Sequence, residues 1–384
     1  MTTSKGLGLY FHIPFCARKC RYCDFVSFPV SDAGAHLEYI LKIIYEIRAK
    51  RPLKTSGGAA ALVDTVYIGG GTPSYIDAAL ITELLDAIYA TFNVDEKAEL
   101  TIEVNPGTAD AEKFKEYRSA GINRVSIGAQ SFDAGTLKFL RRIHSPEDTV
   151  GSVEDARAAG FGNINLDLIF GVPGRELAAW KNDLKAAVGL DPEHLSFYGL
   201  QIEDGTPLYE DFICGDFEPI DELEDRGMYH FAKGYLANRG LFQYEISNSA
   251  KPGYESRHNL KYWSMEPYLG FGVGAHSYFG GRRFSNKGGL KEYLEAKDEG
   301  EMTDWAHDNT LSDNMSEYIF LGLRRTAGIE LSSFRDKFGR DFWEVYGEET
   351  EGLIGRGLLE KTGETLRLTS LGLDLANTVF SEYV

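Results

Sequence analysis

The feature that most constrains the fold is a regular alternation of apolar runs and helix-like segments along residues 8–200. Six runs have the length and composition of strands, at 8–13, 64–70, 100–105, 124–130, 164–171 and 194–200. Segments of helical character stand between them, at 36–50, 79–92, 110–121, 146–160 and 177–189. Strands that alternate with helices form βα units and a parallel sheet. We therefore expect an α/β fold.

Three polar residues stand near the carboxyl ends of these strands, namely Glu103, Gln130 and Asp167. A carboxylate in a strand as apolar as INLDLIFG is costly to desolvate unless it has a partner. In barrels of parallel strands the carboxyl ends hold the active site. A structural ion pair with Arg142 explains the two carboxylates equally well, so both interpretations remain open at this point.

The pattern changes from residue 310 onward. Three helix-like segments are followed by a hairpin candidate, LLEKTGETLRLT, and a last helix, SLGLDLANTVFSEYV. This order predicts a small helical, winged-helix-like accessory domain at 310–384 beside a main domain at 1–300. Residues 310–384 contain 8 Lys plus Arg and 13 Asp plus Glu, a net charge of −5. That charge disfavours DNA binding, so we expect a packing or lid role.

Composition excludes several classes of protein. The chain has 40 Lys plus Arg and 58 Asp plus Glu, a net charge of −18, which disfavours a nucleic-acid partner. We find no run of eighteen apolar residues and expect no membrane span. Four cysteines, three of them crowded together, do not form a disulfide framework for 384 residues. They indicate metal ligation in a reducing compartment, and hence the cytoplasm.

The crowded cysteines lie in HIPFCARKCRYCDF, with Cys16, Cys20 and Cys23 separated by three and then two residues. A structural zinc site normally needs a second Cys or His pair, and none follows, although His12 is a conceivable fourth ligand. Three thiolates suit a [4Fe–4S] cluster better and leave its fourth iron open to an exchangeable ligand. The remaining cysteine, Cys214, is assigned no role.

A glycine-rich turn, IGGGTPS at 68–74, follows the second strand. It lacks the Lys of a phosphate loop, and Ser74 stands where a dinucleotide fingerprint has its third glycine. By itself it is a tight βα turn whose glycines let the backbone approach a ligand closely.

The spacing C-x3-C-x2-C, followed by Asp24 and Phe25, resembles the signature of the radical S-adenosylmethionine (SAM) superfamily. Further stretches, in order along nearly the whole chain, resemble the oxygen-independent coproporphyrinogen III oxidase-like family: GGGTPS, EVNPG, RVSIGAQSF, RRIH, NINLDLIFGVPG, EDGTPLY, YEISNSA, HNLKYW and GFGVGAHS. This resemblance implies a partial (β/α)6 TIM-like barrel of the radical SAM type. It also implies a [4Fe–4S] cluster, SAM bound at the open iron, and an electron donor such as flavodoxin or ferredoxin.

The resemblance also implies a SAM site, position by position. Gly70, Gly71 and Thr72 are expected at the methionyl end, and Tyr10 near the sulfonium. The remaining expected contacts are Glu103, Gln130 and Arg142 near the methionyl and ribose groups, Asp167 near the ribose, and Gln201 near the adenine.

Two features separate the classes within this family. True oxidases carry another cysteine two residues after the third, where this chain has Phe25. Their haem-chaperone relatives, the HemW type, lack that cysteine and carry an HNxxYW stretch, which is HNLKYW at 258–263 here. Both features favour a chaperone that binds haem and passes it to acceptor haem proteins, without coproporphyrinogen oxidase activity. The alternatives are an anaerobic coproporphyrinogen III oxidase and a radical SAM haem methylase that opens the macrocycle.

His258 is the expected haem ligand, because imidazole is a good axial ligand and Tyr262 and Trp263 could cover a porphyrin face. Without the resemblance, a hydrogen-bonding cap or a core position would explain this stretch as well. His276, in GAHSY, is a second candidate. The sequence leaves open the acceptor, the covalency of haem binding, SAM cleavage, and whether the chain is a monomer or a homodimer.

Overall fold

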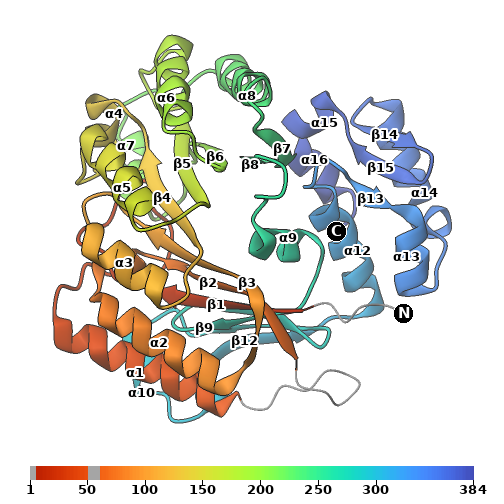
Figure 1. Ribbon diagram of the computed structural model, residues 1–384. Helices are drawn as coiled ribbons and strands as arrows, with labels where there is room; N and C mark the ends of the chain where they lie inside the picture. Colours follow the sequence, from red (N-terminus) through yellow and green to blue (C-terminus); the bar gives the residue numbers. More distant parts are fainter. Residues whose placement is uncertain (1–5, 51–60) are drawn as a thin grey trace.

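The computed structural model describes residues 6–50 and 61–384 (Figure 1). Its centre is a run of six parallel strands in sequence order. They are β1 Leu7–Ile13, β2 Leu62–Gly70, β3 Asn93–Val104, β4 Arg124–Gln130, β5 Ile164–Phe170 and β6 His194–Gly199. All six predicted strands are present, and β3 begins earlier than predicted. The predicted α/β fold is confirmed.

Helices cover the outer face of this sheet, with α1, α2 and α3 lying against the first strands in Figure 1. The five predicted helices are α1 Ala33–Ala49, α2 Ala78–Thr91, α3 Ala111–Ser119, α5 Pro146–Ala158 and α6 Leu177–Gly189, and a short α4 Ala134–Phe139 was not predicted. Side chains cap the amino termini of these helices except α6, as when Asp77 accepts a hydrogen bond from the backbone N–H of Ala79 at the start of α2. The apolar faces of the helices and the sheet form one hydrophobic core.

Short strands extend the sheet at both edges to twelve strands. On one side, β9 Tyr268–Phe271 pairs parallel with β1, and β10 His276–Phe279, β11 Arg282–Asn286 and β12 Thr303–Asp308 follow antiparallel. On the other side, β8 Asn248–Ala250 and β7 Phe242–Glu245 pair antiparallel next to β6. The two edge strands, β12 and β7, do not pair with each other, so the barrel is partial.

Five helices connect or flank these edge strands. They are α7 Pro207–Ile213, α8 Glu222–Ala237, α9 Arg257–Trp263, α10 Leu290–Glu295 and α11 Glu299–Met302.

The last part of the chain packs around a second hydrophobic core, which includes Ile319, Phe334 and Val379. Its helices are α12 Leu311–Gly322, α13 Leu331–Phe338, α14 Phe342–Gly355, α15 Ser370–Asp374 and α16 Ala376–Ser381. Its small sheet has the order β13 Ile329–Glu330, β15 Thr365–Leu368 and β14 Leu359–Thr362. The hairpin of β14 and β15 is the predicted wing, whereas the predicted last helix is split at Leu375. The first core includes buried residues as far as Met302, and the buried residues of the second begin at Met315. The domain boundary near residues 300–310 stays a prediction.

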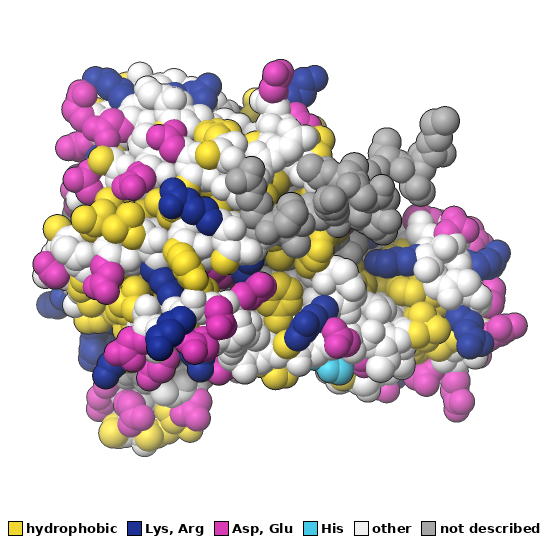
Figure 2. Space-filling view, turned by 90° about the horizontal axis from the view of Figure 1, so that it is seen from below, with side chains coloured by type: hydrophobic (Ala, Val, Ile, Leu, Met, Phe, Trp, Pro, Cys, Tyr) yellow, Lys and Arg dark blue, Asp and Glu magenta, His cyan; other side chains and the backbone are white. Residues whose placement is uncertain are grey.

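The surface carries charges of both signs. Figure 2 shows one face, on which acidic and basic side chains are interspersed and apolar side chains are exposed between them. The negative net charge is therefore not concentrated as a single patch on this face. In the described parts of the chain, we find no helix with the length and apolar character that crossing a membrane requires.

Candidate functional site

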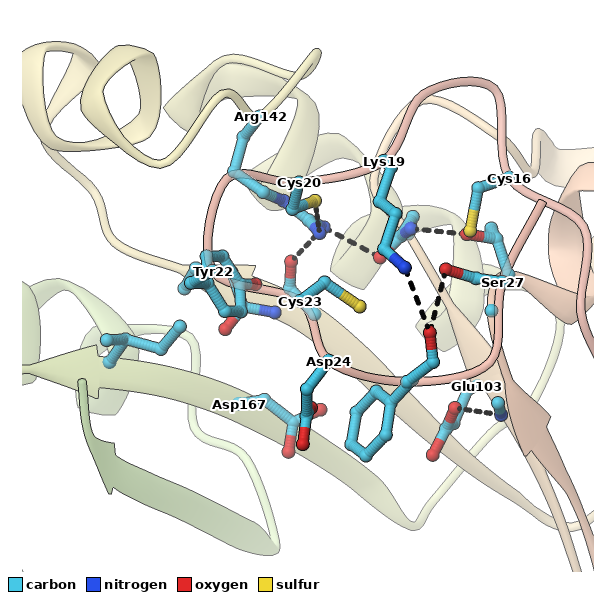
Figure 3. A pocket seen from close by; sticks show the side chains of 18 of the residues that line it. Cys16, Lys19, Cys20, Tyr22, Cys23, Asp24, Ser27, Glu103, Arg142 and Asp167 are labelled. Carbon is cyan, nitrogen blue, oxygen red and sulfur yellow. Dashed lines mark hydrogen bonds between the residues drawn. The ribbon is translucent and has the colours of Figure 1, made fainter. Parts of the chain in front are cut away.

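A cavity of about 440 Å³ lies at the carboxyl ends of the parallel strands. The loop that follows β1 and bears the three cysteines forms one wall of this cavity (Figure 3). The cavity brings together every residue predicted for the cluster and for SAM except Tyr10: Cys16, Cys20, Cys23, Gly70, Gly71, Thr72, Glu103, Gln130, Arg142, Asp167 and Gln201. This is the edge where barrels of parallel strands hold their active sites.

A chain of hydrogen bonds connects two of the thiols. The hydroxyl of Thr72 donates to Sγ of Cys16 at 3.3 Å, and Nη1 of Arg142 donates to Sγ of Cys20 at 3.3 Å. Between them, the amide of Asn105 donates to Thr72 Oγ1 at 2.7 Å and accepts from Arg142 Nη2 at 2.6 Å. The guanidinium of Arg142 thus places positive charge beside the thiols, and this charge acts to lower the pKa of the Cys16 thiol.

The three thiols fit a cluster. Burial raises the pKa of the Cys16 and Cys23 thiols. A metal ion or another positive charge next to these thiols would favour their deprotonation. Within residues 6–50 and 61–384, no three His, Cys, Asp or Glu side chains come close enough together to hold a single metal ion. A [4Fe–4S] cluster takes each thiolate on a different iron, so it accepts thiols that line a cavity without converging on one point. Cys214 is exposed at the end of α7, away from this cavity.

His12 is not placed as a fourth ligand. Its Nδ1 shares a hydrogen bond with the hydroxyl of Tyr10 at 3.0 Å, and its Nε2 shares one with the carbonyl oxygen of Val26 at 2.7 Å. Both ring nitrogens are therefore already occupied, and the ring does not line the cysteine cavity.

The glycine-rich turn needs glycine at two positions. Gly70 has a φ of +113°, and a Cβ there would lie 2.5 Å from the ring of His12. A Cβ at Gly71 would lie 2.8 Å from the carbonyl carbon of Pro14 in the cysteine loop. The glycines therefore let the turn pack directly against the loop that carries the thiols.

Two half-buried carboxyl groups, Glu103 of β3 and Asp167 of β5, line the cavity. Glu103 accepts hydrogen bonds from the hydroxyl of Tyr67 and the backbone N–H of Gly70, both at 2.9 Å. Burial, together with the charge of Asp167, raises the pKa of Glu103 to about 7. Asp167 accepts from Ser126 at 3.0 Å and from Asn165 at 2.9 Å, and burial raises its pKa as well. Two carboxyl groups with raised pKa values in one cavity are typical of a functional site.

The structure decides against the ion-pair interpretation of these carboxylates. The guanidinium of Arg142 hydrogen-bonds to Cys20, to Asn105 and to the carbonyl of Gly128, not to Glu103 or Asp167.

Gln130 ends β4 with a φ of +61°, a conformation that is uncommon outside glycine. Such backbone strain is found at ligand sites more often than elsewhere. Gln201 lies beyond β6, where its amide donates to the carbonyl of Gly199 at 3.3 Å, and it lines the same cavity. Both predicted residues therefore line the cavity wall.

Two predicted residues lie elsewhere. Tyr10 lines a second cavity instead of the cysteine cavity. His258 is buried at 1% exposure, with Nδ1 2.8 Å from the hydroxyl of Thr65 and Nε2 2.8 Å from that of Tyr262. Burial, aided by the charge of Lys261, lowers the pKa of His258 to about 3. Haem iron could bind this ring only if one of these two hydrogen bonds were broken. The role of His258 as an axial ligand of haem stays a prediction.

Sequence reasoning missed several residues of the cavity wall, among them Tyr67, Asn105, Ser126 and Tyr198. Asn105 had a signal, because it follows the third strand directly within EVNPG. Tyr67 and Ser126 lie inside apolar strands, and their sequence context does not separate them from core positions.

Comparison with known proteins agrees with this geometry. The family model of the radical SAM superfamily matches residues 10–187, and that of the HemN C-terminal domain matches residues 309–375. The chain is 37% identical to the heme chaperone HemW of Bacillus subtilis, over 98% of each chain. It is 35% identical to HemW of Lactococcus lactis, over 99% of this chain and 98% of that one.

The chain belongs to the HemW family of the radical SAM superfamily. Membership of the superfamily implies a [4Fe–4S] cluster and SAM as cofactors. Among solved structures, coproporphyrinogen III oxidase HemN from Escherichia coli is similar, with a TM-score of 0.86 and 22% identity over 99% of this chain and 90% of that one. At this identity the similarity establishes the fold, including the accessory domain at the carboxyl terminus.

Proposed function

We propose that the chain is a cytoplasmic haem chaperone, which binds haem and transfers it to acceptor haem proteins. The observation that carries this proposal is the similarity to heme chaperones named HemW along almost the entire length of the chain. Phe25 supports it, because this exposed aromatic stands where the oxidases have their additional cysteine. A phenyl ring can neither ligate iron nor transfer a hydrogen atom as a thiol can.

In this proposal, Cys16, Cys20 and Cys23 hold the cluster, and Arg142 and Thr72 donate hydrogen bonds to its cysteine ligands. When bound, the cluster would supply electrons and an open iron for SAM, fed by a donor such as flavodoxin or ferredoxin.

The strand ends would hold SAM. The backbone of the glycine turn lies next to the cysteine loop, where the methionyl end of SAM would sit. Glu103, in its ionised form, would attract the ammonium or sulfonium charge, and Asp167 would accept hydrogen bonds from ribose hydroxyls. The ionisation of Glu103 should therefore contribute to SAM affinity at this site.

One experiment separates this function from its alternatives. The reconstituted, reduced protein is incubated anaerobically with SAM and, in separate reactions, with coproporphyrinogen III and with haem, and the products are identified by mass. Recovery of both tetrapyrroles unchanged, with stable binding of haem, is the expected result. Loss of carboxylate carbon would identify an oxidase, and an opened ring would identify a haem methylase; either outcome would refute the proposal.

A further inference from the structure

A second cavity, of about 520 Å³, lies beside the cysteine cavity. Asp24 and Phe25, at the end of the cysteine loop, line both cavities. The second cavity has the size of a pocket for a small ligand, which is roughly 300–1,000 Å³. It is also adjacent to the loop in which Phe25 replaces the cysteine of the oxidases.

The walls of this second cavity are rich in aromatic rings. Tyr262 and Trp263 come from α9, and Tyr268 and Tyr278 come from β9 and β10. Flat aromatic walls suit a flat, largely apolar ligand such as a porphyrin. The buried indole N–H of Trp263 has no hydrogen-bond partner within the described residues. A bound ligand with an acceptor group would satisfy it.

One histidine of this cavity has a ring that is open to a ligand. His276, the first residue of β10, lines the cavity and is exposed, and within residues 6–50 and 61–384 no hydrogen bond to its ring is found. By contrast, both ring nitrogens of His12 and of His258 are occupied. The β10 backbone is fixed by antiparallel pairing, with His276 opposite Ser285 of β11.

The surroundings of His276 favour its neutral form. Partial burial, and secondly the charge of Arg283, lower the pKa of His276 below its usual value. A neutral imidazole is the form that binds haem iron.

We propose that this second cavity is the haem site and that His276 supplies an axial ligand to the iron. The inference rests on the proposed haem function and assigns that function to a place in the fold. A porphyrin there would lie between the aromatic rings of α9, β9 and β10, next to the cluster loop.

The same arrangement gives His258 a different role. Its Nε2 is hydrogen-bonded to the hydroxyl of Tyr262, whose ring lines the cavity. His258 therefore acts as a positioning residue, because it holds Tyr262 in the cavity wall. Its loss would loosen the wall and weaken haem binding without changing the group bound to iron.

The test is a titration of the full-length, cluster-loaded protein with ferric haem, monitored by the Soret band and by the electron paramagnetic resonance signal of the iron. For His276→Ala we expect a shifted Soret band, a changed electron paramagnetic resonance signal, and haem binding at least about tenfold weaker. Added imidazole should restore the spectrum of the wild type. For His258→Ala we expect weaker binding with the wild-type signature. His307→Ala, which removes an exposed histidine of β12 that does not line the cavity, is the matched control and should bind as wild type.

The outcome for His276→Ala decides the inference. An unchanged spectrum and affinity in His276→Ala would overturn the inference. If only His258→Ala changed the Soret band and the electron paramagnetic resonance signal, His258 and not His276 would be the axial ligand. Failure of the wild-type protein to bind haem would instead refute the proposed function. Retention of the cluster absorbance by each variant shows that the variant is folded.

Discussion

The raised pKa of Glu103 leads to a specific prediction about SAM binding. SAM carries sulfonium and ammonium charges, and the ionised carboxylate attracts them, whereas the protonated carboxyl group does not. With a pKa of about 7, Glu103 is mostly ionised at pH 8 and mostly protonated at pH 6. Because the carboxyl group must lose its proton to hold SAM, affinity should fall as pH falls. The decrease is about tenfold between pH 8 and pH 6, or about 1.4 kcal/mol.

Glu103→Gln tests this reasoning, since glutamine keeps the shape, and its single amide oxygen can still accept the hydrogen bond from the backbone N–H of Gly70. At pH 8 the variant should bind SAM more weakly by about 1–3 kcal/mol, the cost of losing a charge-assisted interaction. Between pH 8 and pH 6 its affinity should lack the tenfold decrease of the wild type. Equilibrium dialysis of labelled SAM against the anaerobic, cluster-loaded protein measures both quantities.

Two further variants make the test sharper. Asp24→Asn removes an exposed carboxylate from the same cavity and should keep the tenfold pH dependence. Asp167→Asn removes the charge that helps to raise the pKa of Glu103, so the midpoint of the pH dependence should move below 7. A Glu103→Gln protein with the full pH dependence of the wild type would refute the reasoning.

Three other predictions follow from the geometry. Cys16→Ala should abolish the cluster absorbance of anaerobically reconstituted protein, whereas Cys214→Ala should keep it; loss in both variants would contradict the assignment. Gly70→Ala should lower the free energy of unfolding by about 1–3 kcal/mol, because its new Cβ would collide with a ring on β1. Gly174→Ala, also at positive φ but with nothing within 4 Å, is the control for backbone strain alone, and equal losses in denaturant titrations would argue against the collision. No carbon dioxide should be released from coproporphyrinogen III with reductant and SAM, because Phe25 replaces a thiol, and release at an appreciable rate would overturn the chaperone assignment.

The six parallel strands could be predicted because helices cover one of their faces and the barrel interior the other, which makes them almost continuously apolar. The strands β7 to β12 could not, because they are short and carry polar residues that resemble loops. Glu103 and Asp167 could be placed in one cavity because the carboxyl ends of parallel strands meet at one edge. The contacts that hold Arg142 to Cys20 depend on loop conformations that the sequence pattern does not specify.

For two residues, Tyr10 and His258, the structure shows contacts that the sequence pattern did not predict. Tyr10 precedes the end of β1 at Ile13 by three residues, which is about 10 Å along a strand, so its side chain reaches the second cavity instead of the cysteine loop. His258 and Tyr262 are four residues apart on α9, a spacing that stacks them on one helix face. Their mutual hydrogen bond occupies the imidazole, and the motif alone does not reveal this.

The central claim, that the protein transfers haem, is tested most directly by a transfer time course. Protein loaded with haem, cluster and SAM is mixed with the apo form of a haem protein, and the return of the acceptor's Soret band is followed. In parallel, haem loss to a non-protein scavenger measures passive dissociation. The account predicts that the acceptor fills faster than the scavenger, with no change in the mass of the haem. Equal rates, or an acceptor that stays empty, would contradict it.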